Sequence, residues 1–215
     1  MKLDKSEMLL YVVTDRTWLG DNKLEDQVEE SIKAGATFVQ LREKELDYDS
    51  FVSEGIKIKK ITDQYQVPFV INDNIEVALA INADGIHVGQ KDMNALDVRS
   101  LIGENKILGV SAQTVEQALL AERQGADYIG VGAVFSTSTK NDADDVSYET
   151  VKAICEAVSI PVVAIGGINE HNISQLKGYG VDGIAVISAI FAKSDISKAT
   201  KELLELSNEM VKGGV

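Results

Sequence analysis

The chain has 215 residues, a length that predicts one domain or two small ones. Its 45% hydrophobic and 26% charged residues are typical of a folded globular protein and exclude a disordered chain, and its single cysteine, Cys155, excludes an intrachain disulfide framework. The net charge of −13 argues against binding to nucleic acid or to an anionic membrane surface.

Short runs rich in β-branched residues recur at near-even spacing and predict strands. They lie at 9–13, 38–41, 69–71, 85–88, 107–110, 128–131, 162–165 and 183–187. Between them apolar residues recur with helical period, as in 24–32 and 151–158. A helix of about two turns is expected within 74–81, and a longer one at 197–211 ends the pattern.

The order of these elements predicts the architecture. The strands are apolar without strict alternation, which is typical of a parallel sheet buried on both faces. Glycines at helix-to-strand junctions, Gly35, Gly125 and Gly180, can end a helix in the left-handed conformation. Eight strand–helix units of about 27 residues predict an α/β fold, a single (β/α)8 or TIM barrel over residues 1–215. An open doubly wound sheet is the less favoured alternative, because the first strand lacks a G-x-G-x-x-G turn.

No segment of the sequence predicts membrane insertion or export. The longest uncharged apolar stretch, at 183–192, is well short of the ~20 residues of a membrane-spanning helix. The first eight residues lack an apolar signal region. We therefore expect a cytoplasmic protein that does not bind a membrane.

Polar residues able to do chemistry follow nearly every predicted strand. In a (β/α)8 barrel the loops after the strands form the reactive face, so these residues are expected to gather at one end. They are Gln40–Lys44, Asn72–Asn74, Gly89–Asp92, Ser111, Thr137–Lys140, Gly166–Gly167 and Ser188.

These residue types suit phosphate groups. The glycine pair 166–167 and Ser188 follow the last two strands, where backbone N–H groups can cradle a phosphate. Arg42, Lys44 and Lys140 come from different strands and can converge on further phosphate charge. The alternative is ordinary: surface ion pairs with neighbouring glutamates, a tight turn and a solvated loop.

Two aspartates indicate a metal. Asp73 and Asp92 follow neighbouring strands, whose axes should lie ~4.8 Å apart, so their carboxylates would repel each other. Mg²⁺ bound by one or two carboxylates and substrate phosphates would relieve that repulsion. Alternatively, each aspartate caps the helix that follows it, and Ser111 and Ser188 likewise act only as N-caps.

The remaining reactive residue types favour structural roles. Cys155 lies on an apolar helical stripe with no histidine placed to activate it. His87 lies inside the fourth predicted strand, and His171 lies near a helix start. Two histidines so separated do not predict a metal site.

Motifs along nearly the whole chain resemble the thiamine phosphate synthase family. They are LYVVTDR at 10–16, VQLREK at 39–44, IND at 71–73, ADGIHVGQKDM at 83–93, GVS at 109–111, DYIGVG at 127–132, TSTK at 137–140, AIGGI at 164–168 and IAVIS at 184–188. Any one of these motifs is weak evidence, but their occurrence together and in order is highly specific.

The resemblance implies a (β/α)8 barrel transferase with two small-molecule partners. It would join 4-amino-5-hydroxymethyl-2-methylpyrimidine diphosphate to 4-methyl-5-(2-phosphoethyl)thiazole, releasing pyrophosphate and thiamine phosphate. It implies that the pyrimidine diphosphate is bound by Gln40, Leu41, Arg42, Glu43, Lys44, Asn72, Ser111 and Lys140. It further implies Mg²⁺ on Asp73 and Asp92, and the thiazole phosphate on Thr137, Ser138, Thr139, Gly167, Ile187 and Ser188. The oligomeric state stays open between a single chain and a homo-oligomer.

The implied reaction is a dissociative, Mg²⁺-assisted substitution. The diphosphate leaves first, because the ring amino group delocalises the cation that develops at the exocyclic carbon, and the thiazole nitrogen then attacks. We expect Arg42, Lys44, Ser111 and Lys140 to stabilise the leaving group, so no strong base is required.

Three other functions are weighed against this one. A related thiazole tautomerase would need neither the aspartate pair nor the diphosphate-binding cations. A catalytically silent barrel that only binds thiamine precursors has no evident need of both the aspartate pair and the diphosphate-binding cations. A phosphosugar isomerase on the same fold would need a paired general acid and base, which the sequence does not provide.

Overall fold

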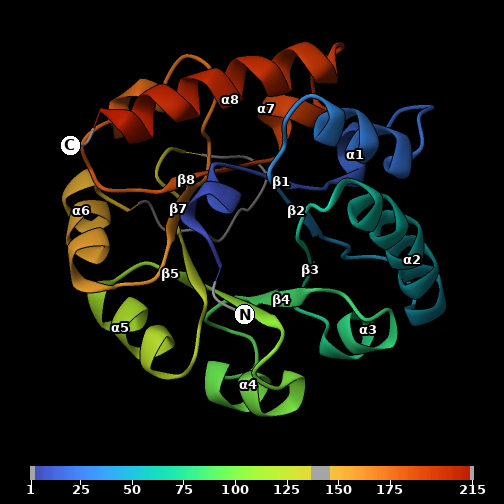
Figure 1. Cartoon of the computed structure of the whole chain (residues 1–215), viewed down its shortest axis with the longest axis horizontal. Helices are drawn as coiled ribbons and strands as arrows, with labels where there is room; N and C mark the ends of the chain where they lie inside the picture. The colour runs from blue at the N-terminus through green and yellow to red at the C-terminus, as the bar shows by residue number, and fades with distance from the viewer. Residues whose placement is uncertain (1–2, 137–145, 214–215) are drawn as a thin grey trace.

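The computed structural model describes residues 3–136 and 146–213, and these form a closed barrel of parallel strands that pair in sequence order (Figure 1). The strands are β1 (Leu10–Val13), β2 (Phe38–Leu41), β3 (Phe69–Asn72), β4 (Gly85–Val88), β5 (Ile107–Ala112), β6 (Tyr128–Val131), β7 (Val162–Ile165) and β8 (Gly183–Val186). The barrel closes because β1 pairs with both β2 and β8. The predicted (β/α)8 fold is confirmed, and the open-sheet alternative is excluded.

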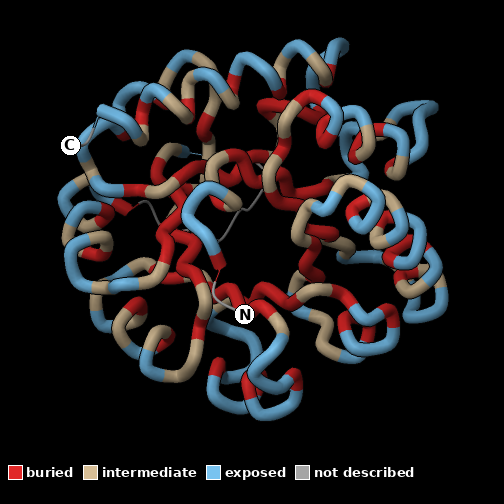
Figure 2. Tube along the Cα trace, in the orientation of Figure 1, coloured by how far each residue is buried: buried red, intermediate tan, exposed pale blue. Residues whose placement is uncertain are grey.

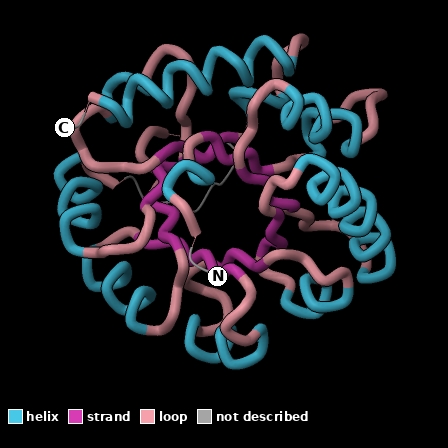
Figure 3. Tube along the Cα trace, in the orientation of Figure 1, coloured by secondary structure: helices cyan, strands magenta, loops and turns pink. Residues whose placement is uncertain are grey.

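Helices surround the barrel on the outside (Figure 3). They are α1 (Leu24–Lys33), α2 (Tyr48–Tyr65), α3 (Ile75–Ala80), α4 (Ala95–Ile102), α5 (Val115–Arg123), α6 (Tyr148–Ala157), α7 (Ser188–Phe191) and α8 (Ile196–Lys212). Short 3₁₀ turns are η1 (Lys5–Met8), η2 (Arg16–Trp18) and η3 (Ile173–Leu176), the last of which stands between β7 and β8. Among the described residues, no helix is both long enough and apolar enough to cross a bilayer.

The strands separate two hydrophobic cores, and Figure 2 shows the barrel as the most buried part of the chain. The outer core lies between the strands and the helices and includes Leu41. The inner core fills the barrel and includes Tyr11, Phe38 and Tyr128, whose rings meet edge to face. Because alternate residues of a strand point to opposite faces, each strand supplies both cores.

A repeated hydrogen-bond pattern fixes the amino-terminal ends of the strands. The residue just before each even-numbered strand accepts, through its side chain, a backbone N–H at the start of the preceding strand. The pairs are Thr37 with Leu10, Asp84 with Phe69, Asp127 with Leu108 and Asp182 with Val162, at 2.8–2.9 Å. The junction glycines Gly35, Gly125 and Gly180 have φ values of 115°, 91° and 89°, which confirms their predicted left-handed conformation.

Asp182→Ala is expected to lower the free energy of unfolding by about 1–3 kcal/mol, because the buried N–H of Val162 would lose its acceptor. Equilibrium urea denaturation measures this change. The control is Asp97→Ala on the exposed first turn of α4, which should change stability by no more than about 0.5 kcal/mol. Equal effects of the two substitutions would contradict the role given to Asp182.

Candidate functional site

Polar side chains from four neighbouring strands meet at the carboxyl end of the barrel. Gln40, Asn72, His87 and Ser111 stand at or near the ends of β2, β3, β4 and β5. Asn72 and His87 are direct partners in the strand register, and His87 Nε2 lies 2.9 Å from Ser111 Oγ. Three of these four residues were predicted to bind the diphosphate.

Arg42 is held in place by Asp15, which follows β1. Its Nη1 donates to Asp15 Oδ2 at 3.2 Å, and the two side chains are only 12% and 13% exposed. The Arg42 backbone N–H donates to Thr14 Oγ1 at 3.0 Å. The guanidinium is therefore positioned before any ligand arrives, and it keeps other N–H groups for one.

In the rest of the segment 40–44, Leu41 and Glu43 have side chains that contact other parts of the protein, whereas Lys44 has an exposed side chain. Glu43 accepts both of its short hydrogen bonds from Arg16 Nε, at 2.8 and 2.9 Å, and its side chain is 3% exposed. Burial raises the pKa of the Glu43 carboxyl, and the Arg16 guanidinium opposes that rise. The side chain of Leu41 packs in the outer core, so both residues leave mainly backbone groups for a ligand. Lys44 is exposed and pairs with no carboxylate in residues 3–136 and 146–213.

Neither aspartate of the predicted metal site caps a helix. Asn74 caps α3 and Asn94 caps α4. Asp73 adopts φ 62°, donates its N–H to His87 O at 2.9 Å and accepts from Asn72 Nδ2 at 2.5 Å. Asp92 Oδ2 accepts the Gly89 N–H at 2.7 Å. Both aspartates are exposed, which leaves the capping alternative without support.

The two aspartates, Asp73 and Asp92, suit a cation whose remaining ligands come from the bound substrate and from water. Among the described residues, no three His, Cys, Asp or Glu side chains are grouped to hold a metal. Mg²⁺ is commonly bound by one or two carboxylates and completed by phosphate and water. Asp73 and Asp92, two exposed carboxylates after adjacent strands, are suited to that mode of binding.

The glycine loop after β7 packs against the loop after β6. Gly166 and Gly167 have φ values of 102° and 65°. A Cβ at Gly167 would lie 2.6 Å from the carbonyl oxygen of Ser136, so a larger residue does not fit. The Gly167 carbonyl accepts hydrogen bonds from the side chains of Asn169 and Asn172. Its N–H donates to no acceptor among the described residues, and backbone N–H groups in such a loop are of the kind that can bind an anion.

The two serines predicted to bind phosphate are not N-caps. Thr114 caps α5, whereas Ser111 lies inside β5. Ser188 is the first residue of α7 and Ile187 occupies the cap position, so Ile187 and Ser188 follow β8 directly. Thr137, Ser138, Thr139 and Lys140 lie outside the described residues.

The other reactive residue types do not join the site. Cys155 lies on α6, and burial raises the pKa of its thiol to about 12, so it stays protonated near neutral pH. His171 is highly exposed beside Glu170. His87, in contrast, lies within the site through its contact with Ser111, which the sequence did not predict. The available signal was its polar character at an inward-facing position of β4.

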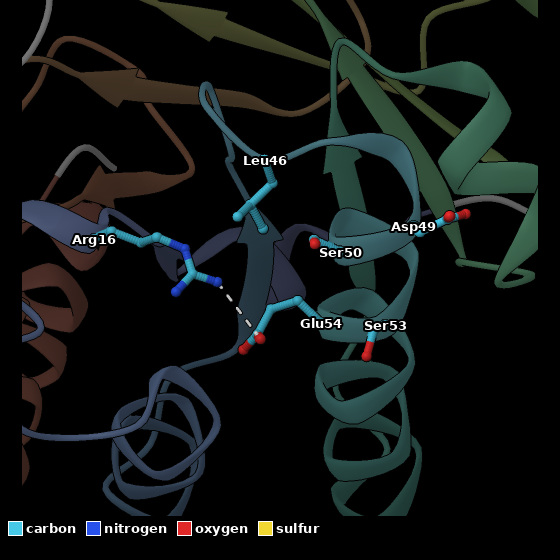
Figure 4. Close-up of a pocket in the computed structure, with 6 residues that line it drawn as sticks. All are labelled: Arg16, Leu46, Asp49, Ser50, Ser53 and Glu54. Carbon is cyan, nitrogen blue, oxygen red and sulfur yellow. Dashed lines mark ion pairs between the residues drawn. The ribbon is translucent and has the colours of Figure 1, made fainter.

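A cavity of about 400 Å³ lies beside the strand ends (Figure 4). It is lined by Arg16, Leu46, Asp49, Ser50, Ser53 and Glu54. Figure 4 shows the Arg16 guanidinium directed toward Glu54, and the two groups lie 3.5 Å apart. None of the predicted ligand-binding residues lines this cavity, although Arg16 also binds Glu43.

Comparison with known proteins gives consistent matches. The family model described as thiamine monophosphate synthase matches residues 10–190. A thiamine-phosphate synthase of Clostridium tetani is 55% identical over 93% of this chain and 96% of its own length. That of Ruminiclostridium cellulolyticum is 54% identical over 94% and 96%, respectively. The solved thiamine phosphate pyrophosphorylase of Pyrococcus furiosus superimposes with a TM-score of 0.89 at 40% identity, covering 96% of this chain and 98% of its own.

Proposed function

The chain belongs to the thiamine monophosphate synthase family, and we propose that its described site joins a hydroxymethylpyrimidine diphosphate to a thiazole phosphate with release of pyrophosphate. The observation that carries this proposal is the placement of Arg42, Asn72, Asp73 and Ser111 at the carboxyl ends of β2, β3 and β5, on one side of the barrel mouth. Cationic and hydrogen-bonding groups of this kind suit a reaction whose barrier lies in the departure of a diphosphate.

The diphosphate would be bound by groups that follow β2 or lie near the carboxyl ends of β3 and β5. Arg42 offers a guanidinium whose orientation is set by Asp15, and Lys44 offers an exposed ammonium. Asn72 and Ser111 add neutral hydrogen-bonding groups at the same end of the barrel. We assign Lys140 to the same group by resemblance. Charge that builds up on the leaving oxygens would thus meet preorganised donors.

Asp73 and Asp92 are proposed to hold Mg²⁺ at the edge of this group. When bound, Mg²⁺ supplies positive charge to the diphosphate and so stabilises its departure. The hydrogen bonds from Asn72 to Asp73 and from Gly89 to Asp92 orient the two carboxylates. This orientation is available without a contribution from the substrate.

The thiazole phosphate would be anchored on the other side of the barrel mouth, after β7 and β8. The Gly167 N–H, together with Ile187 and Ser188, is proposed to bind it, and Thr137, Ser138 and Thr139 are assigned there by resemblance. Anchoring the phosphate would place the thiazole nitrogen for attack on the pyrimidine exocyclic carbon, which makes the bond-forming step effectively intramolecular.

The proposed reaction needs no strong base. The attacking thiazole nitrogen carries a lone pair and loses no proton. The Cys155 thiol is protonated near neutral pH, and both ring nitrogens of His87 are hydrogen-bonded. Catalysis would rest on stabilising the leaving group and on alignment of the two rings.

The proposed function predicts that the protein with both precursors and Mg²⁺ forms thiamine phosphate, detected as thiochrome fluorescence after oxidation. EDTA should abolish the signal, and excess Mg²⁺ should restore it. Each precursor alone is the control. Absence of product with all components present would overturn the proposal, and turnover that EDTA does not change would remove the metal from it.

A further inference from the structure

A continuous chain of polar side chains crosses the interior of the barrel below the candidate site. It runs from Gln40 on β2 through Tyr11 on β1, Tyr128 on β6 and His87 on β4 to Ser111 on β5. The Tyr11 and Tyr128 hydroxyls lie 2.8 Å apart, Tyr128 Oη lies 2.9 Å from His87 Nδ1, and His87 Nε2 lies 2.9 Å from Ser111 Oγ. The sequence resemblance implies that the two end residues, Gln40 and Ser111, bind the pyrimidine diphosphate, and the proposed function gives no role to the three residues between them.

The surrounding residues hold Tyr128 and His87, in the middle of this hydrogen-bonded chain of side chains, tightly in place. Tyr128 is fully buried, and its ring packs against Phe38 and Tyr11 with centroids 5.6 and 5.8 Å away. A Cβ at Gly109 would lie 2.1 Å from Tyr128 Cζ, so only glycine leaves room for the phenol. A Cβ at Gly130 would lie 3.2 Å from His87 Cε1. The phenol and the imidazole therefore have little freedom to leave the chain.

With the Gln40 amide nitrogen facing Tyr11, as the structure places it, the hydrogen bonds among these five side chains have one consistent direction. Gln40 donates its amide N–H to Tyr11 Oη. If Tyr128 donated to Tyr11 as well, the buried Tyr11 hydroxyl proton would have no acceptor among the described residues, which is unfavourable. Tyr11 must then donate to Tyr128, and Tyr128 to His87 Nδ1. Burial raises the pKa of both tyrosines well above the usual range, so each hydroxyl keeps the one proton that it donates in this arrangement.

We propose that Tyr11, Tyr128 and His87 are positioning residues that hold His87 as the neutral Nε2–H tautomer, so that it donates to Ser111 Oγ. The Ser111 hydroxyl proton is then directed away from His87 and is available to the diphosphate. At the other end, the Gln40 amide donates to Tyr11 and keeps its oxygen as an acceptor for the ligand. This inference rests on the proposed function only for the identity of the ligand.

The histidine tautomer can be measured without catalysis. The chain has two histidines, so ¹⁵N-histidine labelling of the full-length protein gives two imidazole patterns, and His171→Gln assigns them. His87 is expected to show an unprotonated Nδ1 and a protonated Nε2. In Tyr128→Phe, which keeps the ring and removes the donor, the Nδ1–H tautomer should become populated. Finding Nδ1–H or a charged imidazole in the unsubstituted protein at neutral pH would overturn the proposal.

The kinetic test asks whether Tyr128 acts through Ser111. Tyr128→Phe should lower kcat about fivefold, the equivalent of one hydrogen bond of about 1 kcal/mol, with a smaller change in KM. In a Ser111→Ala background the same substitution should have almost no further effect. The same fivefold loss in both backgrounds would overturn the proposal.

A matched control and a second variant keep the test decisive. Tyr65→Phe removes a hydroxyl that donates to Glu29 on the outer helices, and it should leave both kcat and the His87 tautomer unchanged. Tyr11→Phe breaks the chain one step earlier and serves if Tyr128→Phe does not fold. If the unsubstituted protein made no thiamine phosphate, the proposed function would fail, whereas the tautomer measurement would still decide the hydrogen-bond chain.

Discussion

Arg42→Ala is expected to lower kcat/KM for thiamine phosphate formation by about 100- to 1,000-fold, the effect of losing one preorganised donor to a developing negative charge. The Asp15 carboxylate holds the guanidinium at 3.2 Å, and both side chains are largely buried. The Arg42 side chain is therefore already fixed in the folded protein, so that little further side-chain entropy is lost when the diphosphate binds. The guanidinium then stabilises the transition state, in which negative charge develops on the diphosphate, more than it stabilises the bound substrate. Steady-state rates of thiochrome-detected product measure the change.

The controls for Arg42 separate its charge from its geometry. Arg42→Lys keeps one positive charge but loses the planar fork, so its rate should fall between those of Arg42→Ala and the unsubstituted protein. Arg123→Ala removes an exposed arginine from the last turn of α5 and should leave the rate unchanged. A loss of less than threefold in Arg42→Ala would show that this arginine does not stabilise the leaving group.

The sequence predicts the barrel well because its strands are short buried runs with clear boundaries. The predicted ranges 38–41, 85–88, 128–131 and 162–165 match β2, β4, β6 and β7. Each of these strands is followed by polar or glycine-containing turns, and its burial on two faces requires a continuous apolar run. β5 extends two residues beyond the prediction, to Ala112, and includes Ser111, because a polar residue near a strand end resembles a loop in the sequence.

Contacts between distant residues could not be predicted in this way. Arg42 and Asp15 are 27 positions apart, and Tyr11 and Tyr128 are 117 apart. Arg42 and Asp15 meet because β1 pairs with β2, whereas Tyr11 on β1 and Tyr128 on β6 meet only when the barrel is closed. For Glu43 the sequence suggested a ligand contact or a local ion pair with Arg42 or Lys44, whereas the structure pairs it with Arg16, which projects from the loop after a different strand. Local pattern indicates which polar residues follow the strands, whereas the closed barrel decides their partners.

Capping was a second point that sequence alone left open. Asp73 and Asn74 are adjacent, and either side chain is a good N-cap for α3. The structure uses Asn74, whose side chain accepts the Val77 N–H, and it leaves Asp73 one residue outside the helix in the left-handed region. Asp73 thus lies at the strand end, outside the helix, because its neighbour Asn74 caps the helix.

Asp73→Asn and Asp92→Asn are each expected to lower kcat at least about 100-fold and to raise the Mg²⁺ concentration needed for half-maximal rate. Because both carboxylates are proposed to bind one ion, the double variant should be far less impaired than the product of the two single effects. A Mg²⁺ titration of the initial rate in all four proteins measures both quantities.

These substitutions isolate charge because asparagine suits both backbones. Asparagine tolerates the positive φ of 62° at position 73, and its side-chain oxygen can still accept the Gly89 N–H at position 92. Asp97→Asn, in the exposed first turn of α4, is the matched control and should leave the Mg²⁺ dependence unchanged. Independent, multiplicative losses, or an unaltered Mg²⁺ requirement in both single variants, would mean that the two aspartates do not share an ion. Their exposure after adjacent strands, with neither used as a helix cap, would then need another explanation.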